Sequence, residues 1–323
     1  MSDTPVTVLV DCDPGIDDAL ALFALVQWEK EGRVRFEAVS TVSGNLPLRY
    51  TATNAAFVLD KSGAGDIPVY LGADRPLSRT HLQFAEKIHG PDGLGGVYEE
   101  GHVDPDETVH GAIELARRVR KSAERSSVWI LALGPLTNLA IAFALDPGLP
   151  DLLEGVLVMG GAFGAPGGNT TPWAEFNFAV DPEAVRRVCV SGARIFLIPL
   201  DVTHQVPFTE RDLQRIETRT KSGRFALGLF QAGLHLQQRR GAHEMYLHDA
   251  LAASALILPD LFQFHECEME IGLCGDLAGA SLVRSRRPGE EVRTNVSVAF
   301  GVEVSRARSF LLQTWGGGGA SGF

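Results

Sequence analysis

Four acidic residues lie within eight positions near the start of the chain, in the run Asp-Cys-Asp-Pro-Gly-Ile-Asp-Asp. They are Asp11, Asp13, Asp17 and Asp18, and they directly follow the apolar stretch from Val6 to Val10. Two unit charges about 4 Å apart repel each other by ~4 kcal/mol at an effective dielectric constant of roughly 20. Helix capping accounts for one or two of these acids and not for four. A divalent cation would offset the repulsion, so the cluster predicts a metal site.

Polar residues also follow the other apolar runs of strand length. The segments in question are Ser43-Gly44-Asn45, Gly134-Pro135-Leu136-Thr137-Asn138, the stretch from Gly160 to Asn169 with Glu175-Phe176-Asn177 beyond it, and Asp201-Val202-Thr203-His204. In open parallel sheets, ligands bind outside the carboxyl ends of the strands. Acids and amides with few bases would therefore converge on one sheet edge, where they suit a hydroxyl-rich ligand held with a hard cation.

Apolar runs of strand length alternate with helical stretches, and this alternation predicts the strands and helices that would hold these polar residues in place. The predicted strands are Val6 to Val10, Phe36 to Val42, Pro68 to Leu71, Ser127 to Leu133, Gly155 to Met159 and Arg194 to Leu200. The predicted helices are an amphipathic one from about Pro14 to Trp28 with Pro14 in its first turn, Leu48 to Leu59, one from Thr137, and Ala250 to Leu258. This pattern predicts an α/β fold with an open, mostly parallel central sheet and helices on both faces. We expect a single domain over residues 1–315 and a flexible Gly-rich tail over residues 316–323.

Composition narrows the possible classes of protein. The 323 residues are 45% hydrophobic and 21% charged, which permits a large core. A formal net charge of -11 and the lack of a Lys/Arg-rich run argue against nucleic-acid binding. No apolar run reaches the ~20 residues of a membrane span, and the N-terminus lacks the features of a secretion signal. The four scattered cysteines form no CxxC pair and indicate reduced thiols in a cytoplasmic protein.

The run from Asp11 to Leu20 resembles the N-terminal signature of the nucleoside hydrolases, the inosine/uridine-type nucleoside N-ribohydrolases. Further segments similar to that family follow in the family's order over about residues 6–260: Thr41-Val42-Ser43-Gly44-Asn45, Gly134 to Asn138, Met159-Gly160-Gly161, Asn169 with Glu175-Phe176-Asn177, and His248-Asp249-Ala250. The last sixty residues carry no such motif. The resemblance implies a Rossmann-like nucleoside hydrolase fold and hydrolysis of ribonucleosides to ribose and free base, in a homodimer or homotetramer.

The resemblance also implies one Ca²⁺ at the bottom of the pocket. Its ligands would be Asp13, Asp18, Asp249 and the backbone carbonyl of Leu133, together with water and the ribose 2′ and 3′ hydroxyls. Ca²⁺ accepts about six to eight hard oxygens in loose geometry, which leaves room for a diol. The family often has Thr at the position of Leu133, and the change should matter little because the ligand is a main-chain oxygen.

In the family's mechanism, Asp13 would act as general base on the attacking water and His248 would protonate the departing base. The transition state has oxocarbenium character. Asp11 would support the cluster from outside. The residues expected to contact the nucleoside are Asp17, Asn45 and Asn177 at the 2′ and 3′ hydroxyls, Asn169 and Glu175 at the 5′ hydroxyl, and Met159 and Phe176 as apolar walls. If the segment is extended, Glu175 and Asn177 point to the same side of the chain.

Two segments concern the nucleobase. His89, in the run from His89 to Gly96, is similar to a pocket loop also found in pyrimidine-preferring members. The segment from His235 to Arg240 is expected to lie over the base. Neither segment determines whether a purine or a pyrimidine leaves.

Two alternatives stay open on the residues alone. A phosphatase of the haloacid-dehalogenase type also ends its first strand in Asp-x-Asp, but that motif is normally followed by Thr or Val and needs a downstream Lys. Here Pro14 follows, and no predicted strand end offers a Lys. A non-catalytic nucleoside or ribose sensor would retain the pocket and lose the base or the acid, whereas Asp13 and His248 are both present. The motifs of P-loop, dinucleotide-binding and serine-hydrolase proteins are absent from the sequence.

Overall fold

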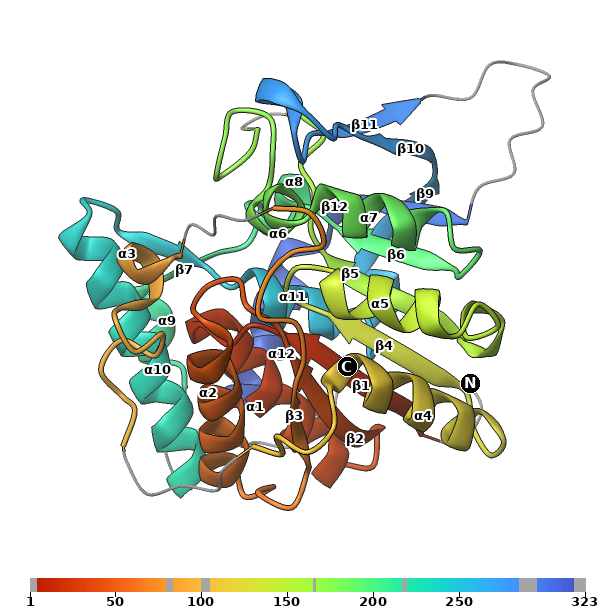
Figure 1. Cartoon of the computed structure of the whole chain (residues 1–323). Helices are drawn as coiled ribbons and strands as arrows, with labels where there is room; N and C mark the ends of the chain where they lie inside the picture. The colour runs from red at the N-terminus through yellow and green to blue at the C-terminus, as the bar shows by residue number, and fades with distance from the viewer. Residues whose placement is uncertain are drawn as a thin grey trace.

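A computed structural model of the whole chain describes residues 5–79, 84–99, 105–164, 167–216, 220–284 and 295–316. Its centre is one sheet of eight strands: β1 (Val6–Cys12), β2 (Val34–Thr41), β3 (Val69–Leu71), β4 (Val128–Ala132), β5 (Gly155–Met159), β6 (Ile195–Ile198), β9 (Phe262–Glu266) and β12 (Val296–Val302). Their order in space is β3-β2-β1-β4-β5-β6-β12-β9 (Figure 1). Neighbours pair in parallel, except that β9 runs antiparallel to β12. The predicted α/β fold with a mostly parallel sheet is confirmed.

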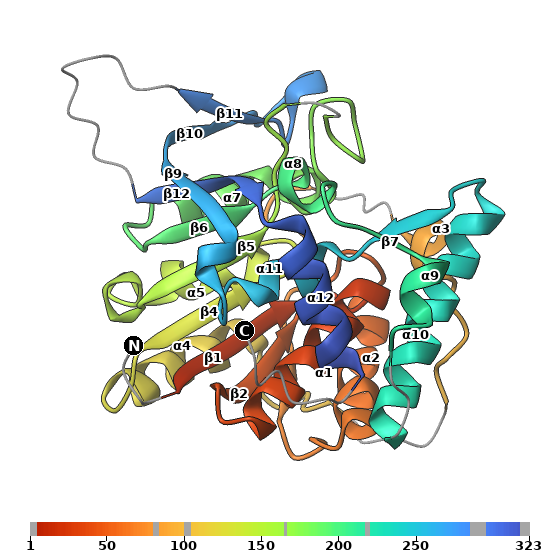
Figure 2. The same ribbon diagram turned by 180° about the vertical axis from the view of Figure 1, so that it is seen from behind.

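Helices cover both faces of this sheet (Figures 1 and 2). One face carries α1 (Ile16–Lys30), α2 (Leu48–Ser62), α10 (Lys221–Arg239), α11 (His248–Ser254) and α12 (Val304–Trp315), and the other carries α4 (Gly111–Ala123), α5 (Thr137–Leu145) and α7 (Pro182–Cys189). Successive side chains of a strand point to opposite faces. Accordingly, Val8 and Val10 join the apolar cluster of the first helix set, and Leu9 joins that of the second.

The first helix differs from its prediction in two respects. It begins at Ile16 after Gly15, so Pro14 lies before the helix and not in its first turn. It is also buried on nearly every side, since it packs against α2, α10, α11 and α12. The predicted amphipathic character is therefore wrong. The run Leu20 to Val26 is apolar around the whole helix, which is the pattern of a helix enclosed by others.

Prolines lie close to two other boundaries that were predicted wrongly. β6 ends at Ile198 because Pro199 follows it and α8 (Leu200–Thr203) begins directly afterwards. α11 ends at Ser254, short of the predicted Leu258, and Pro259 then opens a 3-10 turn over Pro259–Leu261. The residue before a proline disfavours the helical conformation, so Leu258 cannot end a helix as predicted; the restriction does not reach back to Ser254.

The last sixty residues carried no motif, yet they complete the sheet. β12 lies between β6 and β9, and α12 packs against α1. The remaining short elements are α3 (Glu86–His89), α6 (Phe176–Val180), α9 (Glu210–Leu213), the antiparallel pair β7 (Pro207–Thr209) with β8 (Glu244–Tyr246), and the antiparallel pair β10 (Glu268–Ile271) with β11 (Ser281–Arg284). The predicted Gly-rich tail lies outside the described residues beyond Gly316, and the limit of the domain at residue 315 stays a prediction. Among the described helices, none combines the length and the apolar character that a membrane span requires.

Candidate active site

The acidic cluster lies at the carboxyl end of β1, where two helices begin. Asp17 and Asp18 occupy the first turn of α1, and Asp249 occupies the first turn of α11. One carboxylate oxygen from each of these three residues lies within 4.8 Å of the others, and all three side chains are buried. Helix N-termini favour negative charge, but three acids at this spacing repel one another. The group therefore has the composition and the spacing of a cation site.

Asp13 lies beside this group and is completely buried. Its Oδ2 accepts a hydrogen bond from the backbone N–H of Asn45 at 2.6 Å, whereas its Oδ1 has no hydrogen-bond partner. Two glycines leave space for the carboxylate, because a Cβ atom on Gly44 would lie 2.1 Å from Oδ2 and one on Gly134 would lie 2.6 Å from Oδ1. The glycines after β2 and β4 thus admit an acid whose second oxygen is available for chemistry.

Asp18 is engaged on both oxygens. Its Oδ2 accepts from the N–H of Gly15 at 3.0 Å and from Asn45 Nδ2 at 3.4 Å, and its Oδ1 accepts from the N–H of Asp13 at 3.3 Å. Asp249 also forms a hydrogen bond with the Asp18 carboxyl group. Burial first, and then the charge of the neighbouring acids, raises the pKa of Asp18 to about 7 and that of Asp13 and Asp249 well above the usual range. Without a cation, the cluster must retain protons to stay buried.

A cavity of about 360 Å³ opens above the cluster. Predicted site residues that line it are Asp17, Asn45, His89, Leu133, Met159, Asn169, Glu175, Phe176, Asn177, His248 and Asp249. Asp13 and Asp18 are not on the lining, because both are completely buried next to it. Apart from these two acids, the residues predicted to contact the nucleoside or the metal meet in one pocket, whereas the strand-end residues Ser43, Asn138 and Asp201 are not on its lining.

Asn177 and Glu175 organise one wall of the cavity. Asn177 Nδ2 donates to the carbonyl oxygen of Leu133 at 2.8 Å and lies 3.3 Å from that of Met159. Glu175 caps α6, since its carboxylate accepts from the N–H groups of Gly161, Asn177 and Phe178. The segment from Glu175 to Asn177 is not extended, because a side-chain cap starts a helix here, so the condition of that expectation is not met. Both side chains nevertheless line the cavity.

Asn169 supports the same wall, because its Oδ1 accepts from the backbone N–H of Phe176 at 2.8 Å. Asp11 lies apart from the pocket. Its carboxylate accepts from Ser40 Oγ and, at 2.7 Å, from Asn138 Nδ2, which ties β1 to β2 and α5. Asp11 therefore fixes the strand ends that carry the site.

His89 reaches the site from the α3 turn. Its Nδ1 accepts from the backbone N–H of Ile16 at 3.1 Å, and the ring lies against Gly15. Because Nδ1 is an acceptor, the neutral ring carries its proton on Nε2. Burial lowers the pKa of His89, and Asp17 Oδ1 lies 3.9 Å from Nδ1. His89 thus caps the helix that carries Asp17 and Asp18.

His248 precedes Asp249 and contacts two other rings. Its Nδ1 lies 2.7 Å from the hydroxyl of Thr203, and its ring centroid lies 5.4 Å from that of His204 and 6.1 Å from that of Tyr246. Burial lowers the pKa of His248 to about 4. The ring is therefore neutral at pH 7 in this state of the site.

Several residues that line the cavity were given no role from the sequence: His204, Glu244, Met245 and Tyr246. His204 was among the polar residues expected at the sheet edge, whereas the other three were not singled out. The residues around β8 precede α11 and carry no strand-end signal. Of the segment predicted to lie over the base, Gln237 and Arg240 line the cavity and His235 does not.

Fold and site together define an α/β protein with a polar pocket and a candidate cation site at the carboxyl edge of its sheet. The family model of the inosine-uridine preferring nucleoside hydrolases matches residues 8–309. A probable uridine nucleosidase 2 of Oryza sativa subsp. japonica is 32% identical over 94% of this chain and 91% of its own length. The pyrimidine-specific ribonucleoside hydrolase RihA of a Shewanella species is 34% identical over 92% of each chain. A solved plant nucleoside hydrolase superposes with a TM-score of 0.87 at 30% identity, covering 96% of this chain and 99% of that one.

The chain therefore belongs to the inosine-uridine preferring nucleoside hydrolase family. It is an N-ribohydrolase that cleaves ribonucleosides. The predicted family and the predicted class of enzyme are confirmed, and the match decides against the phosphatase and the non-catalytic sensor.

Proposed function

We propose that this enzyme hydrolyses the N-glycosidic bond of ribonucleosides with the help of one Ca²⁺ ion. The observation that carries the proposal is the buried acidic cluster, in which Asp13 Oδ1 and Asp17 Oδ1 have no hydrogen-bond partner beside Asp18 and Asp249. Unpaired buried carboxylate oxygens are costly, and a hard cation is the partner that such oxygens accept.

The donor set fits Ca²⁺. We propose Asp13, Asp18, Asp249 and the carbonyl oxygen of Leu133 as its ligands. The three carboxylates that lie within 4.8 Å of one another are those of Asp17, Asp18 and Asp249, so this assignment differs from that group by taking Asp13 in place of Asp17. The Leu133 carbonyl already accepts from Asn177 and keeps a second lone pair for a cation. When bound, Ca²⁺ would orient the ribose diol and make water easier to deprotonate.

The chain's own residues would perform the remaining work. Asp13 Oδ1 would accept the proton of the water that attacks the anomeric carbon. Asp17, Asn45 and Asn177 would hold the 2′ and 3′ hydroxyls. Positive charge develops on the ribosyl group as the bond breaks, and nearby carboxylates would stabilise that charge. At the other end of the sugar, Asn169 and Glu175 would bind the 5′ hydroxyl, and Met159 and Phe176 would pack against the ring.

We assign the proton for the departing base to His248. A donor hydroxyl on Nδ1 leaves the ring proton on Nε2, and Thr203 has such a hydroxyl at 2.7 Å. The neutral ring would donate an Nε2–H hydrogen bond to the base as negative charge develops on it, and the proton itself would come from the imidazolium form, which becomes neutral imidazole on transfer. His89 would contact the base from the opposite side of the pocket mouth. The names of two relatives favour a pyrimidine ribonucleoside as substrate.

A reducing-sugar assay tests the proposal with uridine, cytidine, inosine and adenosine and with their 2′-deoxy forms. We expect ribose release that is lost on chelation, restored by Ca²⁺, and much slower for the deoxy substrates. Equal rates on deoxy substrates would contradict a role of the diol in the metal site. The cytoplasmic location and the homodimer or homotetramer also stay proposals, and gel filtration with light scattering tests the latter.

A further inference from the structure

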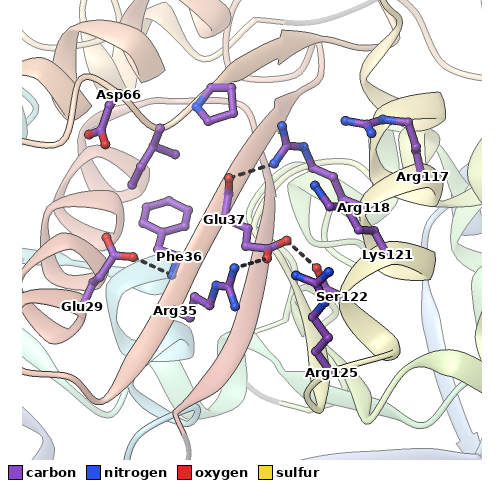
Figure 3. A pocket seen from close by; sticks show the side chains of 12 residues that line it. Glu29, Arg35, Phe36, Glu37, Asp66, Arg117, Arg118, Lys121, Ser122 and Arg125 are labelled. Carbon is purple, nitrogen blue, oxygen red and sulfur yellow. Dashed lines mark hydrogen bonds and ion pairs between the residues drawn. The ribbon is translucent and has the colours of Figure 1, made fainter.

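A second cavity of about 360 Å³ lies at the opposite, amino edge of the sheet (Figure 3). It is bordered by the start of β2, the end of α1, the segment before β3, and the second half of α4 with the residues after it. It shares no lining residue with the cavity above the acidic cluster. Whatever it binds is therefore separate from the nucleoside in the catalytic pocket.

Cations dominate one side of this second cavity. The basic residues that line it are Arg35, Arg117, Arg118, Lys121 and Arg125. The acidic lining residues are Glu29, Glu37 and Asp66. Glu114 pairs with Arg117 and Arg118, so the positive charge left without a carboxylate partner among the described residues is that of Lys121 and Arg125, in a chain with a net charge of -11. Its lining favours an anionic ligand.

Part of this cationic side is fixed in place. Arg118 donates to Glu114 Oε1 at 2.8 Å, to the carbonyl oxygen of Glu37 at 3.3 Å and to the hydroxyl of Tyr70 at 2.8 Å. The Glu37 carboxylate accepts from Ser122 Oγ at 2.6 Å and lies 3.4 Å from Arg35 Nη2. These bonds join α4 to β2 and hold the floor of the cavity.

Two further cations have no such partner. Lys121 and Arg125 are exposed, and neither forms an ion pair or side-chain hydrogen bond within the described residues. They are four residues apart at the C-terminal end of α4, where the helix dipole favours positive charge. The dipole accounts for basic residues there. It does not account for a cavity that they share with Arg35 of a neighbouring strand.

The opposite side of the cavity has different chemistry. Figure 3 shows Glu29 and Asp66 across the cavity from the basic residues of α4, with Phe36 beside Glu29 and Glu37 between the two sides. Ile67 and Pro68 add apolar surface next to Asp66. Carboxylates there would repel a second anionic group and would accept hydrogen bonds from hydroxyl groups. This asymmetry disfavours a nucleic acid or a polyphosphate.

We propose that this cavity binds a small molecule with a single phosphate group and an uncharged, hydroxyl-bearing remainder, namely a sugar phosphate or a nucleoside monophosphate. The phosphate contacts Lys121 and Arg125, since Arg and Lys pair with phosphate through charge-assisted hydrogen bonds. The remainder lies against Phe36 and Pro68 with its hydroxyls toward Glu29 and Asp66. The volume is within the range of roughly 300–1,000 Å³ found for small-molecule sites. The proposal does not depend on the catalytic mechanism.

Calorimetric titration of the full chain tests this site with ribose 5-phosphate, uridine 5′-monophosphate and inorganic phosphate. The variant K121Q/R125Q removes both unpaired cations. The variant R186Q/R187Q removes two exposed cations from α7, which does not line the cavity, and serves as the matched control. Ribose release from uridine, measured for both variants, shows that the fold and the catalytic pocket are intact.

We expect at least one of the two organic phosphates to bind wild-type protein more tightly than inorganic phosphate. Excess ribose should leave this binding unchanged, K121Q/R125Q should weaken it by about tenfold or more, and R186Q/R187Q should not affect it. The single substitutions K121Q and R125Q should each give part of the loss. Three results would each overturn the proposal: no binding of either organic phosphate, displacement by ribose, or equal losses in the two double variants. Binding of inorganic phosphate as tight as that of both organic ligands would also overturn it.

Discussion

Each acid of the cluster has its own hydrogen-bond partners, and these limit what its carboxylate can do. Asp18 caps α1 and has both oxygens engaged, which suits a positioned ligand and not a base. Asp13 keeps Oδ1 without a partner, and Asp17 also has one unpaired oxygen. Asp11 is bound to Ser40 and Asn138 on the far side of β1. The hydrogen-bond partners of each carboxylate thus determine which task that acid can perform.

Asp13→Asn tests the proposed base. The amide oxygen can still accept from the N–H of Asn45, so the fold should survive, while the ability to take a proton is lost. We expect kcat on uridine to fall by about 10²–10⁴-fold. Asp11→Asn makes the same isosteric change at a buried acid of the same segment and serves as the control, with a loss below about tenfold. Turnover of Asp13→Asn within a few-fold of wild type would refute the assignment.

The hydroxyl of Thr203 is predicted to set the proton position on His248. Thr203→Val keeps the shape and removes the 2.7 Å partner of Nδ1, whereas Thr203→Ser keeps the hydroxyl. We expect Thr203→Val to lower kcat by about tenfold with little change in KM, and to alter the pH profile of kcat. Thr203→Ser should restore most of the activity. If the two variants behave alike in both readouts, the hydroxyl has no part in positioning the proton.

At the scale of elements, α10 offers a matched pair of glycines. A Cβ atom at Gly228 meets nothing within 4 Å, whereas one at Gly233 would lie 2.7 Å from Met245 Cε beside the cavity. Gly228→Ala should raise the free energy of unfolding by about 0.5–1 kcal/mol, since alanine is the better helix former. Gly233→Ala has the same gain in propensity but must displace Met245, so we expect lower stability than Gly228→Ala and a raised KM for the nucleoside. Denaturant unfolding and steady-state kinetics measure both, and a larger stabilisation at Gly233 would contradict the packing.

The elements that the sequence predicted well are those with a local signal. β5 has its predicted bounds, and Asp17 and Asp18 lie in the first turn of a helix as expected. Most of the pocket residues that were predicted follow strand ends, where a parallel sheet gathers them, whereas His89, His248 and Asp249 do not. Local hydrophobic patterns predict the parallel strands, and parallel strands bring their carboxyl ends to one edge of the sheet. The positions of the residues at strand ends could therefore be predicted from the sequence.

The elements that were missed depend on contacts distant in sequence. The enclosure of α1 requires α10, α11 and α12, and α12 comes from the segment without motifs. Tyr246 and His204 meet at 4.6 Å between ring centroids, although they are far apart in the chain. No period or spacing encodes these distant contacts. The helical start at Phe176 is different, because it follows from a local contact, the Glu175 side-chain cap on the backbone N–H groups of Asn177 and Phe178.

At the scale of the whole molecule, β2 connects two sites of opposite character. Arg35 and Glu37 at its start border the basic cavity, and Asn45 beyond its end binds Asp13 and Asp18. An eight-residue strand separates its ends by roughly 25 Å, at about 3.3 Å a residue. One rigid strand therefore keeps the cation-binding chemistry and the proposed phosphate-binding chemistry apart.

The buried acids should make the stability of the metal-free protein depend on pH. Burial raises the pKa of Asp11, Asp18 and Glu175 to about 7 from their usual values of 3.8, 3.8 and 4.5. Between about pH 4 and 7 the folded state then holds more protons than the unfolded state, so the free energy of unfolding falls as the pH rises through this window. The stabilisation is complete below the unfolded pKa values and is lost above about pH 7.

A bound cation would change the pH dependence of stability only at its carboxylate ligands, because there it competes with protons for the same oxygens. We expect denaturant unfolding in excess EDTA to show a clear loss of stability from about pH 6 to pH 8. With excess Ca²⁺, stability should be higher at both pH values, by about 2.7 kcal/mol where the Ca²⁺ concentration is a hundred times the dissociation constant, and by more at pH 8 than at pH 6 because fewer protons compete there. The loss between the two pH values should also be smaller, since Asp18 no longer gains a proton on folding while Asp11 and Glu175 still do. Identical unfolding curves in EDTA and Ca²⁺ would mean that the cluster holds no Ca²⁺, and the repulsion among its acids would then have to be offset by retained protons alone.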